Sequence, residues 1–296
     1  MTVVLLPEAE PRPRRVAVGT FDGVHLGHRE VIAGADTVLT FDPHPMGVVS
    51  PGHEPPLLTT LERKHELVSS LGVDELVVIP FDASFAAQTP QAFVEEVLIG
   101  RLGATHVSVG ENFRFGARAK GDTALLQADE RFDTRVVPLL EIDGEIVSSS
   151  HIRGLVLGGA VEYADTLLGD AFIIDGEVVH GDQRGRTLGY PTANLVPRDR
   201  YVTPGHGVYA CRVRTADGAW HTAATSIGVR PMFESGLGEL IEAFLLDFDG
   251  DLYGQEIRIE FRKRLRGERR FDSVDALLEQ MARDVDDARA IVAGAG

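Results

Sequence analysis

Residues 181–194 combine flexible backbone, positive charge and short polar side chains in one stretch. Its glycines recur at four-residue intervals, and glycine lets backbone N–H groups approach an anion closely. Two arginines add charge, and a hydroxyl and an amide two positions apart offer oxygens that suit Mg²⁺. An ordinary surface turn is the alternative interpretation. The candidate residues for nucleotide and metal binding are Gly181, Arg184, Gly185, Arg186, Gly189, Thr192 and Asn194.

A second segment, residues 18–28, places two histidines after a glycine-bearing loop. His25 and His28 are three positions apart, so they share a face if a helix begins here. The amides and dipole of a helix N-terminus attract anions, and imidazoles can donate hydrogen bonds to phosphate oxygens as charge builds. A structural or surface pair is the alternative, but the position after a strand and a glycine loop favours phosphate binding.

The first half of the chain alternates short apolar strands with helical segments. Residues 61–71 and 91–102 predict helices, the second with Thr89 as its cap and Pro90 in its first position. Two further helices follow, one capped by Ser149 or Ser150 and one over residues 161–168. This alternation is typical of an α/β, Rossmann-like, doubly wound parallel sheet, which binds ligands at the carboxyl ends of its strands. The predicted strands are 15–18, 37–41, 76–79, 106–109 and 135–139.

From residue 172 onward the pattern changes to one strand after another, separated by Gly/Asp turns. Such a run predicts a closed or nearly closed antiparallel β-barrel. A terminal amphipathic helix, opened by Asp272 or Ser273, follows it. We therefore expect two domains, residues 1–169 and 170–296. The predicted barrel strands are 172–179, 207–214, 240–248 and 256–262.

The overall composition narrows the class of partner. A formal net charge of −16 repels a long polyphosphate backbone, so we expect no nucleic acid partner. A small nucleotide can still bind where Mg²⁺ and local arginines reverse the sign, which makes the metal an electrostatic expectation. Cys211 stands alone, which excludes an intramolecular disulfide framework. The absence of an export signal and of a membrane-spanning run adds to the expectation of a cytoplasmic protein.

The amino-terminal half resembles the nucleotidylyltransferase superfamily with its His-x-Gly-His signature. It is more closely similar to the bacterial bifunctional riboflavin kinase and FAD synthetase family. Three further blocks carry the resemblance in the same order: Thr-Phe-Asp-Pro-His-Pro at 40–45, Gly-Glu-Asn-Phe-Arg-Phe-Gly at 110–116 and Ser-Ser-Ser-His-Ile-Arg at 148–153.

That resemblance implies adenylylation of FMN by ATP, with release of pyrophosphate. The FMN phosphate is already ionised, so no general base is needed and catalysis rests on positioning and charge stabilisation. His25 and His28 are then expected to bind the ATP phosphates, and Arg153 to supply a counter-charge. Residues around ATP or flavin would be Gly19, Phe21, Asp22, Gly23, Asn112 and Ser149.

The second half resembles riboflavin kinase from residue 172 to about 289, through Pro-Thr-Ala-Asn at 191–194 and blocks at 207–209, 227–231, 241–242 and 246–254. The implied reaction moves the ATP γ-phosphoryl group to the riboflavin 5′-hydroxyl. A neutral alcohol must lose its proton as it attacks, so a carboxylate in reach is useful. Glu242 is the candidate base, and an outward-facing strand glutamate is its alternative. Thr192 and Asn194 are the candidate Mg²⁺ ligands.

Several features leave alternatives open. Only residues 29–39 separate His28 from the 40–45 block, which shortens the first helix to about two turns and allows a chain with kinase activity alone. Ser226 and Met232 depart from the usual kinase pattern near the expected flavin side. The acidic cluster at 247–251 lacks the glutamate of an EF-hand and is expected to form a turn. A flavin-binding protein without turnover and a transient homo-oligomer also stay open.

Overall fold

A computed structural model describes residues 1–181, 189–229 and 239–294. The chain divides into two compact units, Met1–Ser149 and Ser150–Gly296. This division precedes the boundary expected at residues 169/170. The reason is that the two helices following Ser149 belong with the second unit, where α8 (Val161–Leu168) packs on barrel strands β9 (Phe172–Val179) and β14 (Glu256–Arg266).

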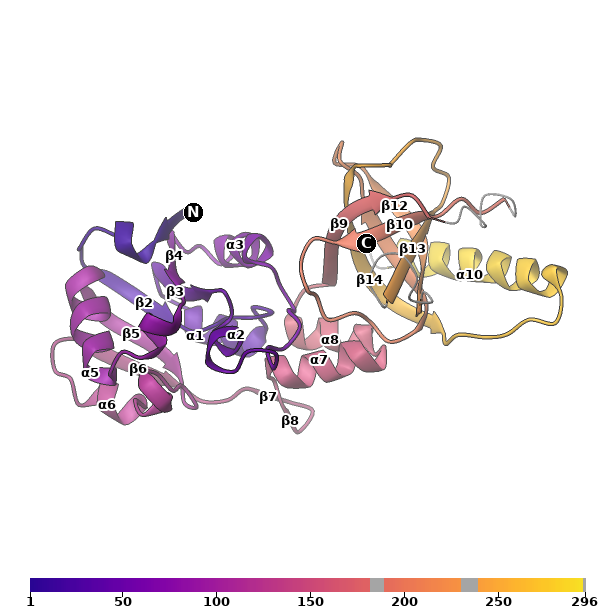
Figure 1. Ribbon diagram of the computed structural model, residues 1–296. Coiled ribbons are helices and arrows are strands. Elements are labelled where there is room, and N and C mark those ends of the chain that lie inside the picture. The colour runs from indigo at the N-terminus through magenta and orange to yellow at the C-terminus, as the bar shows by residue number, and fades with distance from the viewer. Residues whose placement is uncertain (182–188, 230–238, 295–296) are drawn as a thin grey trace. The chain divides into compact units, whose positions relative to one another are not determined.

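The first unit is built on a parallel sheet, as expected (Figure 1). In the described residues its strands run in the order β1-β4-β3-β2-β5-β6, and every neighbouring pair is parallel. The edge strand β1 was not predicted, because its four residues precede the first recognisable alternation. The strands are β1 (Thr2–Leu5), β2 (Arg14–Val18), β3 (Thr37–Asp42), β4 (Glu75–Pro80), β5 (Ala104–Gly110) and β6 (Asp133–Val137).

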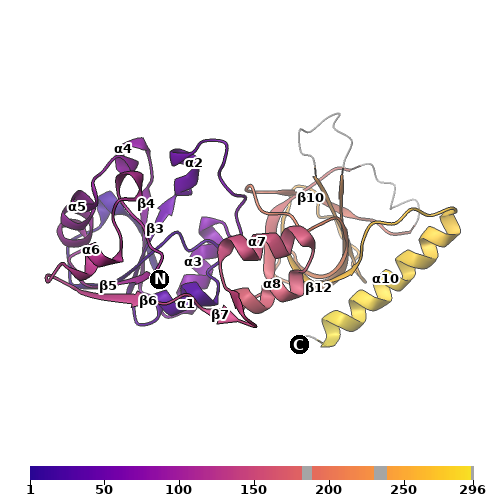
Figure 2. The same ribbon diagram turned by 90° about the horizontal axis from the view of Figure 1, so that it is seen from below.

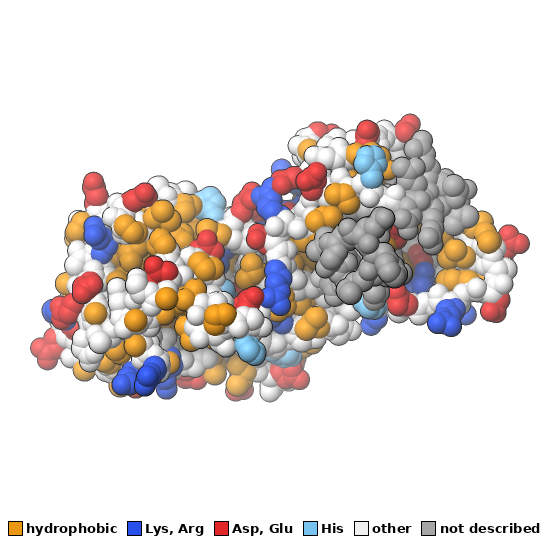
Figure 3. Space-filling model, in the orientation of Figure 1, with side chains coloured by type: hydrophobic (Ala, Val, Ile, Leu, Met, Phe, Trp, Pro, Cys, Tyr) orange, Lys and Arg blue, Asp and Glu red, His pale blue; other side chains and the backbone are white. Residues whose placement is uncertain are grey.

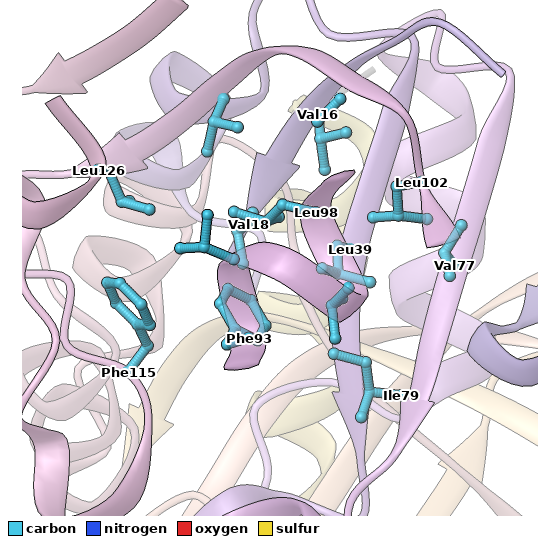
Figure 4. Packing of buried hydrophobic residues seen from close by; sticks show 14 of the residues in the cluster. Val16, Val18, Leu39, Val77, Ile79, Phe93, Leu98, Leu102, Phe115 and Leu126 are labelled. Atoms are coloured by element: carbon cyan, nitrogen blue, oxygen red, sulfur yellow. The ribbon is translucent and has the colours of Figure 1, made fainter. Parts of the chain in front are cut away.

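Helices cover both faces of this sheet, so successive strand residues enter different cores. Val16 and Val18 of β2 pack in one cluster with Phe93, Leu98 and Leu126, as Figure 4 shows, whereas Ala17 packs in the other. Thr89 caps helix α5 and Pro90 is its first residue, as predicted. The helices are η1 (Leu6–Glu8), α1 (Leu26–Ile32), α2 (Pro45–Val49), α3 (Leu61–Ser70), α4 (Ala83–Ala86), α5 (Pro90–Ala92), the π-helical η2 (Phe93–Arg101), η3 (Ala117–Ala119) and α6 (Thr123–Gln127), and a hairpin of β7 (Glu141–Ile142) and β8 (Glu145–Ile146) follows.

The second unit contains a closed antiparallel barrel, in the order β10-β13-β12-β11-β14-β9 among the described residues. The sequence predicted the barrel but not two of its strands, β10 (Ala193–Pro197) and β12 (Trp220–Val229). Ser273 opens the terminal helix α10 (Val274–Gly294), and α10 packs on β11, β12 and β14 (Figure 2). The remaining elements are α7 (Ser149–Gly158), β11 (Gly207–Arg214) and β13 (Glu239–Leu245).

Acidic and basic side chains are interspersed on the face drawn in Figure 3. Cys211 is buried in β11 as a free thiol, and burial raises its pKa to about 12. Among the described residues, no helix has both the length and the apolar character needed to cross a bilayer.

Candidate active sites

The loop between β2 and α1 holds the two histidines at a helix N-terminus. His25 is the N-cap of α1, and its Nδ1 accepts a hydrogen bond from the backbone N–H of His28 at 3.2 Å. An accepting Nδ1 places the proton of a neutral ring on Nε2, the kind of donor that a phosphate oxygen needs. The two imidazoles stack with their centroids 3.5 Å apart. The structure therefore brings His25 and His28 together, as predicted.

The backbone of this loop is strained and tightly supported. Phe21 and Val24 have φ values of 48° and 42°, in the left-handed region that side chains such as these rarely adopt. The buried Phe21 ring packs edge-on against His28 and lies so close to Gly19 that a Cβ there would come within 2.9 Å of it. The Phe21 ring therefore leaves no room for a side chain at position 19. Gly23, at φ 92°, takes a conformation that favours glycine.

Asp22 supports the loop from within. Its buried carboxylate accepts hydrogen bonds from the backbone N–H groups of Leu58 and Thr59, and the N–H of Gly23 donates to the Thr59 hydroxyl at 2.9 Å. Ser149 donates from Oγ to the Asp22 carbonyl at 2.8 Å. Asp22 and Ser149 therefore meet at the loop, and the contact of either with ATP stays a prediction.

The short helix α1 is held by side chains from neighbouring strands. Its terminal carbonyls would lack partners within the helix. Ser108 donates to the carbonyl of Val31, Arg135 to that of Ala33 and Arg15 to that of Gly34, at 2.7, 2.8 and 2.8 Å. Arginines also complement the negative end of the helix dipole. Two turns are therefore enough here to hold both histidines, which removes the structural reason for doubting this site.

Two other predicted residues of the first site lie further away in sequence. Asn112 is exposed in the turn that follows β5, the strand next to β2 in the sheet. Arg153 is buried on α7 and belongs to the second compact unit. Their roles around ATP stay predictions.

In the barrel, Asn194 and Glu242 lie directly opposite each other. Asn194 of β10 pairs in register with Glu242 of β13, which also pairs with Ser226 of β12. Directly opposed residues of antiparallel strands share a face, so these three side chains project from one side of the sheet. Ile241 and Ala243, on either side of Glu242, are fully buried, and Glu242 lies on the other face. Glu242 thus faces outward, which was the alternative considered for it, and Asn194 lies on the same face.

A cavity of about 540 Å³ lies against this part of the barrel. Thr192 and Asn194 line it together with Phe248, Asp251 and Tyr253. The buried Oδ1 of Asn194 has no hydrogen-bond partner among the described residues, and a cation bound there would satisfy it. The two proposed metal ligands therefore reach one cavity of a size that suits a nucleotide or flavin.

Residues 251–253 also line the cavity, and the ring of Tyr253 belongs to an aromatic stack. Asp251 accepts a hydrogen bond from the N–H of Tyr253 at 2.9 Å, and the Tyr253 ring stacks on His180 with centroids 3.8 Å apart. The acidic cluster at 247–251 forms a turn after β13, as expected, and in the described residues it joins no group of side chains able to hold a metal ion. The aromatic stack was not predicted, because His180 and Tyr253 are far apart in the sequence.

Comparison with known proteins agrees with these two sites. A family model for FAD synthetase matches residues 8–151, and one for riboflavin kinase matches residues 168–292. Curated relatives named bifunctional riboflavin kinase/FMN adenylyltransferase include that of Listeria monocytogenes, 38% identical with 94% of this chain and 92% of the relative covered, and that of Bacillus subtilis, 39% identical with 92% and 90% covered. The chain belongs to the bifunctional riboflavin kinase/FMN adenylyltransferase family. Both of its enzymatic domains are present.

A solved structure has the same fold over nearly the whole length. It is a protein of Streptococcus pneumoniae described as a macrolide-efflux protein, with a TM-score of 0.88, 31% identity, and 98% of this chain and 99% of that chain covered. The likeness shows that this fold has been observed in a crystal structure.

Within the family's kinase pattern, three predicted residues cannot be placed. Arg184, Gly185 and Arg186 lie outside the described residues, as does Met232. Gly189 is described and has φ 84°, a conformation that favours glycine. The arginines' roles beside the nucleotide stay predictions.

Gly181 lies close against the side chain of Asn194, which its spacing did not reveal. A Cβ at this position would lie 2.3 Å from Nδ2 of Asn194, closer than any non-bonded contact allows. In Gly181→Ala, the side chain of Asn194 or the backbone at residue 181 must shift. Because such a shift misplaces a proposed metal ligand, we expect kcat/KM for riboflavin phosphorylation to fall about 100-fold. Steady-state assays of FMN formation measure this.

Gly158→Ala is the matched control, because a Cβ there meets no atom within 4 Å. FAD formation from supplied FMN should be unchanged in both variants. Normal FMN formation by Gly181→Ala would contradict the role given to Asn194.

Proposed function

We propose that the second unit transfers the γ-phosphoryl group of ATP to the riboflavin 5′-hydroxyl, and that the first unit joins the resulting FMN to the AMP part of a second ATP. The observation that carries the kinase assignment is that Asn194 lines a cavity of about 540 Å³ and pairs in register with Glu242, which itself is not one of the lining residues. The adenylyltransferase assignment is supported by two stacked imidazoles at a helix N-terminus after a strained glycine loop.

In the kinase reaction, Glu242 takes the proton of the 5′-hydroxyl as its oxygen attacks the γ-phosphorus of ATP. The bond from that phosphorus to the bridging oxygen breaks, and ADP leaves. Glu242 fits this role because it projects from the same face as Asn194. Buried neighbours on both sides hold its strand in place. Positioning and charge stabilisation supply the rest of the rate.

The kinase is proposed to use Mg²⁺ that arrives with ATP. Magnesium is commonly held by one or two protein ligands together with substrate phosphates and water. Thr192 and Asn194 fit that arrangement, since both line the cavity and the Asn194 Oδ1 is buried without a partner among the described residues. When bound, the ion neutralises charge that develops on the phosphates.

In the adenylyl transfer, an oxygen of the FMN phosphate attacks the α-phosphorus of ATP and pyrophosphate leaves. The nucleophile is already an anion, so the first unit needs no base. His25 and His28 donate hydrogen bonds to phosphate oxygens whose charge grows in the transition state. The N-terminus of α1 adds its backbone amides to the same place.

A single incubation tests the two assignments together. The chain is mixed with riboflavin, ATP and Mg²⁺, and the flavins are separated by chromatography. We expect FMN to appear first and FAD to follow, and neither to form when EDTA removes the metal. FMN without FAD would overturn the adenylyltransferase assignment, and riboflavin alone would overturn the kinase assignment. A second incubation with supplied FMN and ATP tests the adenylyltransferase by itself, and no FAD there would overturn it.

A further inference from the structure

Lys64 is a buried cation beneath the loop that carries His25 and His28. It lies on α3, four residues after the N-cap Thr60, and its side chain turns into the unit. Its Nζ donates to the carbonyl of Thr20 at 2.7 Å and to the hydroxyl of Thr40 at 3.1 Å. Thr20 belongs to the loop after β2, and Thr40 to the neighbouring strand β3. The ammonium group thus links the loop after β2 to strand β3, close to the residues of the candidate site.

The surroundings of this ammonium are acidic. The charged groups that face it are Asp22 in the loop and Asp42 at the end of β3. Asp22 is itself buried with its carboxylate on the amides of Leu58 and Thr59. Without a nearby cation, the carboxylate of Asp22 would add negative charge beneath a site meant for polyphosphate. Lys64 is placed to offset it.

The residue type is also informative. The chain contains 29 lysines and arginines, and its lysines are Lys64, Lys120 and Lys263. A compact ammonium reaches the Thr20 carbonyl and the Thr40 hydroxyl together, and an arginine would keep the positive charge there with a less exact fit. A buried charge is costly, and here two hydrogen bonds and two carboxylates offset part of that cost.

We propose that Lys64 is a positioning residue for adenylyl transfer, which holds the Thr20 carbonyl and offsets Asp22 so that the loop presents its amides and histidines to ATP. This inference rests on the proposed function of the first unit. Lys64 acts through the loop and does not touch the reacting atoms.

The charge of Lys64 is sensitive to pH near neutrality. Burial lowers its pKa from 10.5 to about 8, although Asp22 and Asp42 oppose the shift. Between pH 8 and 10.5 this lysine is therefore more protonated in the unfolded chain than in the folded chain. Its contribution to the free energy of folding becomes more favourable as pH rises through that window. Adenylyl transfer should move the opposite way, because the loop loses its cation. If Lys64 only stabilised the fold, the rate of adenylyl transfer would follow the stability of the chain as pH changes and would not fall while stability rises.

The test compares the pH dependence of kcat/KM for ATP in FMN adenylylation with thermal melting of the same full-length chain. In the wild type, kcat/KM should fall about tenfold per pH unit above the lysine pKa, since this ratio reports the free enzyme. In Lys64→Met it should be about 100-fold lower at pH 7, with no alkaline decline. Lys64→Arg should keep activity within about tenfold and also lose the decline, because guanidinium stays charged.

Lys64→Met is expected to fold, because the Thr40 hydroxyl already donates to the Thr20 carbonyl at 3.1 Å and keeps that acceptor paired. Lys120→Met, an exposed lysine of the same unit, is the matched control and should behave as wild type. The inference is overturned if Lys64→Met keeps wild-type kcat/KM or the alkaline decline, or if its loss of activity merely follows a lower melting temperature that Lys64→Arg shares. If the wild type forms no FAD at all, the proposed function itself has failed.

Discussion

Glu242→Gln is expected to lower kcat for riboflavin phosphorylation about 1000-fold, the range that general-base catalysis supplies. Glutamine keeps the shape of the side chain and cannot accept the proton of the 5′-hydroxyl. The strand should be undisturbed, because Glu242 lies on the face opposite the buried Ile241 and Ala243. FMN formation under saturating ATP and Mg²⁺ measures the effect, with FAD formation from supplied FMN as the internal control.

A matched variant separates the role of the position from a general loss of acidic charge. Glu177→Gln changes an exposed glutamate on β9 of the same barrel and should leave FMN formation unaltered. Equal rates for Glu242→Gln and wild type would remove Glu242 as the base and leave positioning alone to account for the kinase.

His28→Ala is expected to lower FAD formation from FMN and ATP by 100- to 1000-fold, the typical effect of removing one donor from a developing oxyanion. His28 is a cleaner target than His25, because the His25 ring caps α1 and its removal would also disturb the helix. FMN formation from riboflavin should be unchanged, since the kinase barrel lies in the other compact unit.

The control for this variant is His106→Ala. His106 lies on β5 towards its amino end and contacts Asp133 at 3.2 Å, far along the strand from the carboxyl end that carries ligands in such sheets. We expect it to retain normal FAD formation. A similar loss in both histidine variants would indicate a stability effect in place of phosphate binding.

Much of the architecture follows from the sequence because local signals agreed with the tertiary structure. The strands at 172–179 and 207–214 were predicted with the bounds observed, since β-branched and aromatic residues fill them and turns flank them. The missed strands had weaker signals. β10 begins within a Pro-Thr-Ala-Asn block that reads as a loop, and β12 carries the small and polar run Thr222 to Gly228. Both segments form strands because they pair with strands that are remote in the sequence.

From the residues alone, the candidate sites were predicted only where chemistry-bearing residues lie close together in the chain, whereas Glu242, Asn112 and Arg153 came from the family resemblance. His25 with His28 and Thr192 with Asn194 are short-range patterns, and the structure places each pair as expected. Lys64 could not be found in this way, because nothing in its helix distinguishes a buried lysine from a solvated one. Its significance comes from Thr20 and Thr40, which only the parallel sheet brings to it.

Strand β10 both carries Asn194 and closes the barrel between β9 and β13. If β10 detached, the other two strands would present open edges, which readily pair with other chains and start aggregation. A nucleotide held by residues 192 and 194 would favour the closed ring by mass action. Binding of substrate and closure of the barrel would then be linked through one strand.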